Sequence, residues 1–152
     1  MKKYLLLFAF SALAMTSCED EDTQNYELDM LKGEWKTSKI EVISGKDNKT
    51  VLYTETLTGC AAKDITEFRT DYYTAYTSFS GVGANCVSSK IEGNYTYNSE
   101  TKELVITYNQ SNAEKYIITI LSSTELRIMQ TQGNVDINGD MVNDPTYITY
   151  RK

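Results

Sequence analysis

The sequence contains no histidine and only one proline. Without histidine, the usual general base near neutral pH and a common zinc ligand are both missing, so the scattered Ser and Thr side chains lack the usual activating partner. Basic residues are also few, with 15 Lys and Arg against 21 Asp and Glu. An acidic balance without a basic stripe argues against binding to nucleic acid. We therefore predict a protein that is not an enzyme and has no nucleic-acid partner.

The aromatic residues are mostly tyrosine, with 12 Tyr against 4 Phe and 1 Trp. The 152 residues allow one domain with one hydrophobic core. Aromatic rings that end in a hydroxyl suit strands facing partly hydrated space. Tyr-rich faces of this kind could stack on sugars or hold an apolar ligand, whereas core and cross-strand packing is their commoner use.

The N-terminal segment has the features of a secretory signal. Two lysines precede an apolar stretch at residues 4–14 that is too short to remain as a membrane-spanning helix. Ser17 and Cys18 follow, and this arrangement resembles the lipobox of bacterial lipoproteins. The resemblance implies that Cys18 is acylated and that residues 1–17 are removed, which lowers the formal charge from −6 to −8 through loss of the two lysines. An ordinary signal cleaved elsewhere is the alternative.

Four acidic residues, Glu19 to Asp22, come directly after Cys18. Their mutual repulsion would keep an extended spacer solvated, and we predict a lipidated acidic tether over residues 18–29. The run also resembles the surface-export signal of lipoproteins in some Gram-negative bacteria. We therefore predict an outer-membrane lipoprotein anchored through its lipid at the cell surface, with a periplasm-facing position as the alternative.

The rest of the chain predicts short strands separated by turns. Alternating apolar and polar residues in about nine runs, with no convincing helix, indicate an all-β antiparallel barrel or sandwich. The predicted strands lie at residues 35–43, 50–57, 64–69, 72–79, 91–97, 104–108, 115–121, 126–131 and 147–151. Eight of them are expected to form a meander. The small residues at 80–86 predict a flexible loop, and residues 29–32 allow at most one helical turn.

Several short motifs, in this order, resemble the lipocalin-like domains of small Gram-negative lipoproteins. They are Leu31-x-Gly33-x-Trp35, Cys60-x-x-Lys63-Asp64 followed by Phe68, Cys86, Gly93-x-Tyr95, Leu104-x-Ile106 and Tyr150. The resemblance implies an antiparallel up-and-down lipocalin-like β-barrel of about eight strands over residues 30–152, with room for one small ligand. It also implies that Trp35 closes the barrel floor. Full-length lipocalins pair this Trp with an Arg near the end of the barrel, which here would be Arg127 or Arg151.

Two cysteines remain once Cys18 is assigned to the lipid, namely Cys60 and Cys86. Exported proteins keep such pairs oxidised, so we predict a disulfide between them. Two buried free thiols are the alternative.

The segment from residue 136 to residue 144 spaces oxygen-bearing side chains as calcium loops do. These side chains are Asp136, Asn138, Asp140 and Asp144. Met141 stands where such loops need glycine, and no Glu supplies the bidentate ligand at the end. The Asn138-Gly139 pair instead favours a type I′ hairpin. Calcium is therefore a secondary hypothesis, and no other cofactor is expected.

Together these features predict a non-catalytic binding or accessory module for a small apolar or sugar-like ligand. The alternative is a structural or assembly partner of a cell-envelope complex, in which the protein's own side chains fill the barrel. The volume of the interior would separate the two.

Overall fold

The computed structural model describes residues 19–109 and 111–152. Over these residues it contains one α-helix, one short 3₁₀ helix and nine strands. Their bounds are α1 Glu19–Leu31, β1 Gly33–Ile43, β2 Val51–Glu55, η1 Ala61–Lys63, β3 Ile65–Phe68, β4 Tyr73–Val82, β5 Asn85–Tyr97, β6 Glu103–Tyr108, β7 Glu114–Leu121, β8 Glu125–Gln130 and β9 Thr146–Arg151. The prediction of about nine strands is confirmed.

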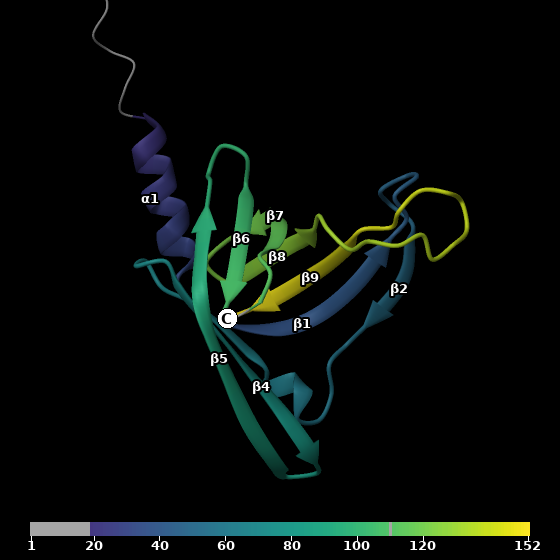
Figure 1. Ribbon diagram of the computed structural model, residues 1–152, viewed down its shortest axis with the longest axis horizontal. Coiled ribbons are helices and arrows are strands. Elements are labelled where there is room, and N and C mark those ends of the chain that lie inside the picture. The colour runs from purple at the N-terminus through teal and green to yellow at the C-terminus, as the bar shows by residue number, and fades with distance from the viewer. Residues whose placement is uncertain (1–18, 110) are drawn as a thin grey trace, which may run out of the picture.

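The strands form a single antiparallel sheet that closes into a barrel because β9 pairs with β1 (Figure 1). From β3 to β9, each strand pairs with the next one in sequence. The strand β3 pairs with the beginning of β1, and β2 pairs with its end, on the edge opposite β9. Eight strands therefore close the barrel and β2 is an extra strand, so the predicted up-and-down barrel is confirmed.

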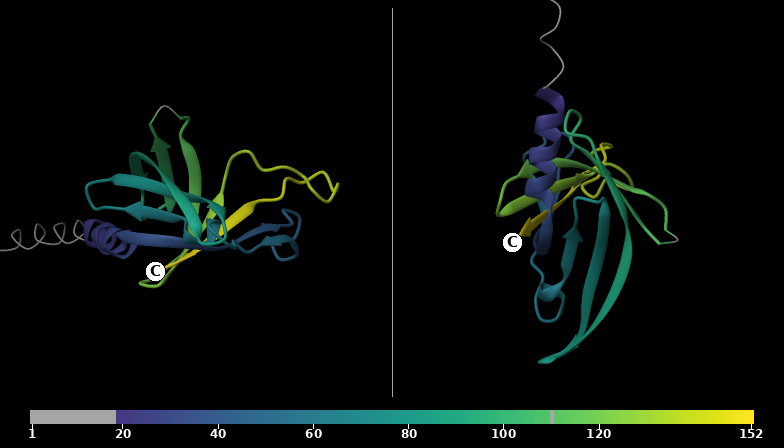
Figure 2. Two further views of the ribbon diagram at one scale, coloured as in Figure 1. Left: turned by 90° about the horizontal axis from the view of Figure 1, so that it is seen from below. Right: turned by 90° about the vertical axis from the view of Figure 1, so that its left-hand side faces the viewer.

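The alternating strand directions give the barrel two different ends, and the helix α1 extends away from one of them (Figure 2). We call this end the floor, and it carries the turns at residues 69–72, 98–102 and 122–124. The opposite end, which we call the mouth, carries the longer connections, including residues 44–50 and 131–145.

The hydrophobic core lies at the floor and in the adjoining half of the barrel. It combines two residues of α1 with inward-facing residues of the strands: Leu28, Leu31, Trp35, Phe68, Tyr95, Tyr97, Leu104, Ile106, Tyr116, Ile118, Leu126, Ile128 and Tyr150. These positions alternate along each strand, as expected when one face of a sheet is buried. The core therefore fills the floor, and the partly buried residues packed against it lie both at the floor, as Leu121 does, and on the mouth side, as Tyr108 does.

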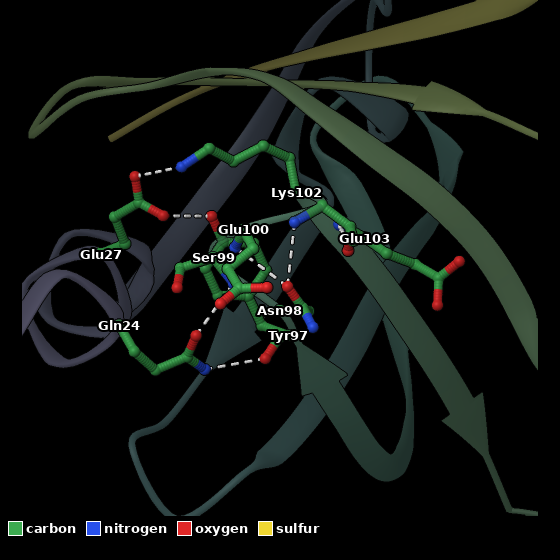
Figure 3. Close-up of polar contacts among 9 residues, drawn as sticks. Gln24, Glu27, Tyr97, Asn98, Ser99, Glu100, Lys102 and Glu103 are labelled. Carbon is green, nitrogen blue, oxygen red and sulfur yellow. Dashed lines mark hydrogen bonds and ion pairs between the residues drawn. The ribbon is translucent and has the colours of Figure 1, made fainter. Parts of the chain in front are cut away.

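The helix α1 corrects the prediction of an extended tether over residues 18–29 and of at most one helical turn. Figure 3 shows how its side chains reach the β5–β6 turn. The Gln24 amide donates to the Tyr97 carbonyl at 2.8 Å and accepts from the Ser99 N–H at 2.9 Å. The Glu27 carboxylate accepts from the Tyr97 hydroxyl and from the Lys102 ammonium. The helix is thus held by contacts with residues about 70 positions later in the chain.

The expected flexible loop at residues 80–86 is also corrected. The strand β4 continues to Val82 and β5 begins at Asn85, so only two residues connect them. The paired register runs without interruption from Tyr73 opposite Asn94 to Val82 opposite Asn85. Regular backbone pairing across the hairpin therefore outweighs the low strand preference of its Gly and Ser residues.

Candidate functional site

Four tyrosines from four different strands share the inner face of the barrel. Tyr76 lies on β4, Tyr108 on β6, Tyr116 on β7 and Tyr150 on β9. Tyr116 and Tyr150 belong to the buried core, Tyr108 packs against it, and Tyr76 is half-buried. Tyr76 and Tyr108 act electrostatically on Tyr150, and Tyr108 and Tyr150 act on Tyr116, so these residues lie close together on the inner face. We call them the tyrosine cluster.

Two of these hydroxyls are held by carboxylates. The Tyr76 hydroxyl donates to Asp64 Oδ2 at 2.6 Å, and the Tyr116 hydroxyl donates to Glu114 Oε2 at 2.7 Å. The other oxygen of Asp64 accepts from the Phe79 N–H at 2.7 Å, which fixes this buried carboxylate against β4. The inner face therefore carries phenol groups in fixed orientations rather than a purely apolar wall.

The environment keeps these phenols neutral. Burial raises the pKa of Tyr108 to about 12, the Thr74 hydroxyl lowers it, and the Glu114 carboxylate adds to the rise. Burial is also the largest cause of the raised pKa of Tyr116, followed by its hydrogen bond to Glu114. For Tyr150, burial raises the pKa most and the neighbouring Tyr108 adds to it. The tyrosine cluster consequently offers uncharged hydroxyl groups at any physiological pH.

The predicted role of Trp35 at the barrel floor agrees with its position. The ring is fully buried, and its Nε1–H donates to the Leu31 carbonyl at 2.6 Å, where α1 ends. Gly33 adopts a positive φ of 121°, and an added Cβ there would lie 3.3 Å from Cε of Lys152. The Gly-x-Trp motif therefore combines a backbone that suits glycine with a Trp that closes the floor.

The cation beside Trp35 corrects the choice between Arg127 and Arg151, because it is Lys152. The Lys152 ammonium lies 4.4 Å from the centre of the Trp35 ring system and donates to the Met30 and Lys32 carbonyls at 2.9 and 2.7 Å. Partial burial lowers its pKa.

Both arginines instead lie on the outer face of the barrel. Arg127 pairs with Glu41 at 3.1 Å and stacks on the Tyr147 ring, whereas Arg151 pairs with Glu125. The side chain of Arg127 also leaves its Nε–H buried without a partner among the described residues. The sequence did not indicate that Lys152 reaches Trp35, because the register of β9 against β1 determines which basic side chain lies beside this ring.

The predicted disulfide between Cys60 and Cys86 is present. Cys60 directly precedes η1, and Cys86 lies on β5 next to the hairpin tip. The bond therefore ties the segment between β2 and β3 to the β4–β5 hairpin, which extends beyond its pairing with β3.

The segment at residues 136–144 forms a loop closed by an isolated bridge between Val135 and Asp144. Its carboxylates accept backbone N–H groups: Asp136 from Gly139 and Met141, and Asp144 from Gly45 and Ile137. Within residues 19–109 and 111–152, no group of three or more His, Cys, Asp or Glu side chains could hold a metal ion.

The turn in this loop differs from the expected type I′ hairpin. Gly139 has a positive φ of 77°, but Asn138 is not among the positive-φ residues that a type I′ turn requires. The loop is organised by Asp136, which accepts three backbone N–H groups and whose pKa is lowered mainly by the bond from Met141.

Cys18 and the proposed signal at residues 1–17 lie outside the described residues. The one long helix that is described, α1, is neither long nor apolar enough to span a membrane.

A family model and several solved structures are similar to this chain. A family model described as a lipocalin-like domain matches residues 31–128. The solved structures similar to it include Odorant Binding Protein OBP1, which is 10% identical, has a TM-score of 0.42 and aligns over 82% of this chain and 72% of its own. They also include a bovine odorant binding protein, a deswapped triple mutant, at 14% identity and a TM-score of 0.39 over 81% and 74% of the two chains. No curated protein sequence matches this chain significantly.

Proposed function

Because the chain belongs to the lipocalin-like domain family, we propose that its barrel is a non-catalytic module that binds one small molecule above the tyrosine cluster. The observation that carries this proposal is the convergence of four tyrosines from four strands on the inner face. Their rings offer apolar contact, and their neutral hydroxyls offer a few oriented polar groups, which is the usual composition of a small-molecule site. The ligand suited to it has an apolar body and at least one polar group.

A lipid at the N-terminus would leave the mouth of the barrel facing away from the membrane. We propose that Cys18 carries lipid in the outer membrane, and α1 begins directly after it. The helix packs against the floor through Leu28 and Leu31, so the mouth lies at the opposite end from the anchor.

The anchor is tested with two variants of the full chain. Cys18→Ala should leave the protein soluble and unlipidated in the periplasm, and continued partitioning into a detergent phase would contradict this. Replacement of residues 19–22 by Ala, which preserves helix preference, should keep lipidation but remove accessibility to external protease. Unchanged surface labelling would leave the acidic run as a spacer only.

Ligand binding is tested with the neutral fluorescent probe N-phenyl-1-naphthylamine. The variant Gln130→Trp puts a large ring on the inner face beside Tyr116, whereas Met129→Trp puts the same ring on the outer face of β8. We expect the inner variant to weaken probe binding by at least about tenfold, a change of about 1.4 kcal/mol, and the outer variant to bind as the wild type does. A urea unfolding curve for each variant shows that both are folded. Equal binding by both variants would place the probe outside the barrel and refute the proposal.

The second candidate, a structural partner with a filled barrel, is favoured by the core that already occupies the floor half. In that case Gln130→Trp should be destabilising through overpacking, by about 1–3 kcal/mol, and no probe should bind to the wild type.

A further inference from the structure

The hydrogen bonds of the tyrosine cluster determine what its oxygens can still bind. An ionised carboxylate only accepts hydrogen bonds, so the proton of the Tyr76 hydroxyl points to Asp64 and that of the Tyr116 hydroxyl points to Glu114. Each phenol oxygen keeps its lone pairs free of that bond. Such an oxygen accepts hydrogen bonds from a ligand more readily than it donates to one, which favours ligands that carry N–H or O–H donors.

The charges on the inner face have one sign. Glu114 is an exposed residue on the inner face at the mouth end of β7, two residues before the core residue Tyr116, and the buried Asp64 contacts the same face through its hydrogen bond from Tyr76. In the part of the chain that the structure describes, neither Asp64 nor Glu114 forms an ion pair with Lys or Arg. Their negative charge therefore has no internal counter-ion.

The basic residues of the barrel strands point outward. They alternate with inward-facing neighbours, and four of them are paired with acidic residues of the outer face. These strand residues are Lys36, Lys39, Lys90, Lys115, Arg127 and Arg151. An anionic ligand such as a fatty acid would thus meet two carboxylates and no compensating cation on the inner face of the described strands.

We propose that this site selects an organic ammonium ion with an aromatic or apolar body, a conclusion that rests on the small-molecule binding proposed above. The ammonium group would donate to the phenol oxygens and to Glu114, with charge-assisted hydrogen bonds that are stronger than neutral ones. The faces of the tyrosine rings add cation–π attraction, and the rest of the ligand covers the apolar core. The mature acidic chain would also draw cations toward the mouth.

Three small probes of similar shape test the charge preference: 2-phenylethylamine, 2-phenylethanol and 3-phenylpropionate. Their binding to the purified protein is measured by calorimetry at neutral pH. We expect the amine to bind about tenfold more tightly than the alcohol, as a charged hydrogen bond and cation–π contact allow, and the carboxylate to bind least.

Glu114→Gln should remove the preference for the amine over the alcohol, because it removes the negative charge that the ammonium group would contact. Glu103→Gln is the matched control, because Glu103 is an exposed residue on the outer face of β6. Tyr116→Phe, which keeps the ring and removes the accepting oxygen, provides a second variant that should also lower the preference for the amine.

The outcomes separate the two proposals. If the amine and the alcohol bind equally and Gln130→Trp abolishes both, the barrel binds ligands but the selection for ammonium is wrong. If the neutral dye binds and none of the three probes does, the ammonium proposal is likewise overturned. If the dye fails as well, the proposed function itself fails. An equal effect of Glu114→Gln and Glu103→Gln would show that surface charge, not the site, attracts the amine.

Discussion

Lys152 gives the sharpest test of how the floor is held. Its ammonium donates to two backbone carbonyls at the end of α1 and lies over the Trp35 ring. One side chain therefore joins the last strand, the helix and the floor Trp. Lys152→Met keeps the length of the side chain and removes all three contacts, so we expect the free energy of unfolding to fall.

The size of the loss follows from the contacts. A hydrogen bond to a charged group contributes about 1.5–3 kcal/mol, but the two bonds share one solvent-exposed ammonium group and are not additive. An exposed cation–π contact adds about 0.5–1 kcal/mol, and a cation at a helix C-terminus adds about 0.3–1 kcal/mol. Allowing for exposure, we expect a total of about 1–2 kcal/mol, or a drop in Tm of several degrees.

The assay is urea unfolding followed by the fluorescence of the single, fully buried Trp35. Lys115→Met is the control, because Lys115 is exposed on β7 and lies far from the floor Trp in the barrel register. Lys152→Arg should keep most of the stability, since a guanidinium can donate to the same carbonyls. The reasoning fails if Lys152→Met and Lys115→Met have equal unfolding free energies.

Three further predictions concern the wall, the interior and the mouth. Replacing Cys60 and Cys86 with Ser should lower the unfolding free energy by about 3 kcal/mol, and mass measurement after alkylation should find neither Cys60 nor Cys86 alkylated in the unreduced wild type. Between neutral pH and pH 10 the tyrosines should not change the stability, but it should fall as the pH rises from 10 toward 12, because folding raises the pKa of Tyr95 and Tyr108 to about 12 and their ionisation disfavours the folded state. Denaturant titrations at several pH values measure this loss, and an unfolding free energy that stays the same up to pH 12 would contradict the prediction. Millimolar calcium should leave the Tm unchanged, because Asp136 already accepts backbone N–H groups, and a rise of several degrees that Asp136→Ala abolishes would establish a calcium site.

The strands were predictable because their signal is local. Alternation of apolar and polar residues is visible wherever one face is buried, and Leu104, Ile106 and their neighbours on β7 and β8 show it clearly. The helix α1 gave no such signal, because its first turns are acidic and polar. Only Leu28 and Leu31 reach the core, and the contacts of Gln24 and Glu27 are with residues distant in sequence.

The tyrosine cluster could be predicted only in part from the sequence. Each tyrosine sits at an inward position of an alternating strand, so its facing could be predicted. Their convergence could not, because it depends on barrel closure and on the register of four strands. Lys152 illustrates the same limit, since nothing in its sequence neighbourhood distinguishes it from Arg151.

The strand β1 pairs along one edge with two separate strands, β3 and β2, and the length of the connection between these two strands can change. The strands β2 and β3 each keep their own register on β1, at residues 40–43 and 33–36, and residues 56–64 connect them. Insertions or deletions at residues 56–59, before Cys60, would shift neither strand against β1 and would leave Asp64 at Tyr76. The disulfide from Cys60 holds one point of the connection to β5. Residues 56–59 can therefore be redesigned in engineered variants, whereas Cys60 and Asp64 must stay because they hold β5 and Tyr76.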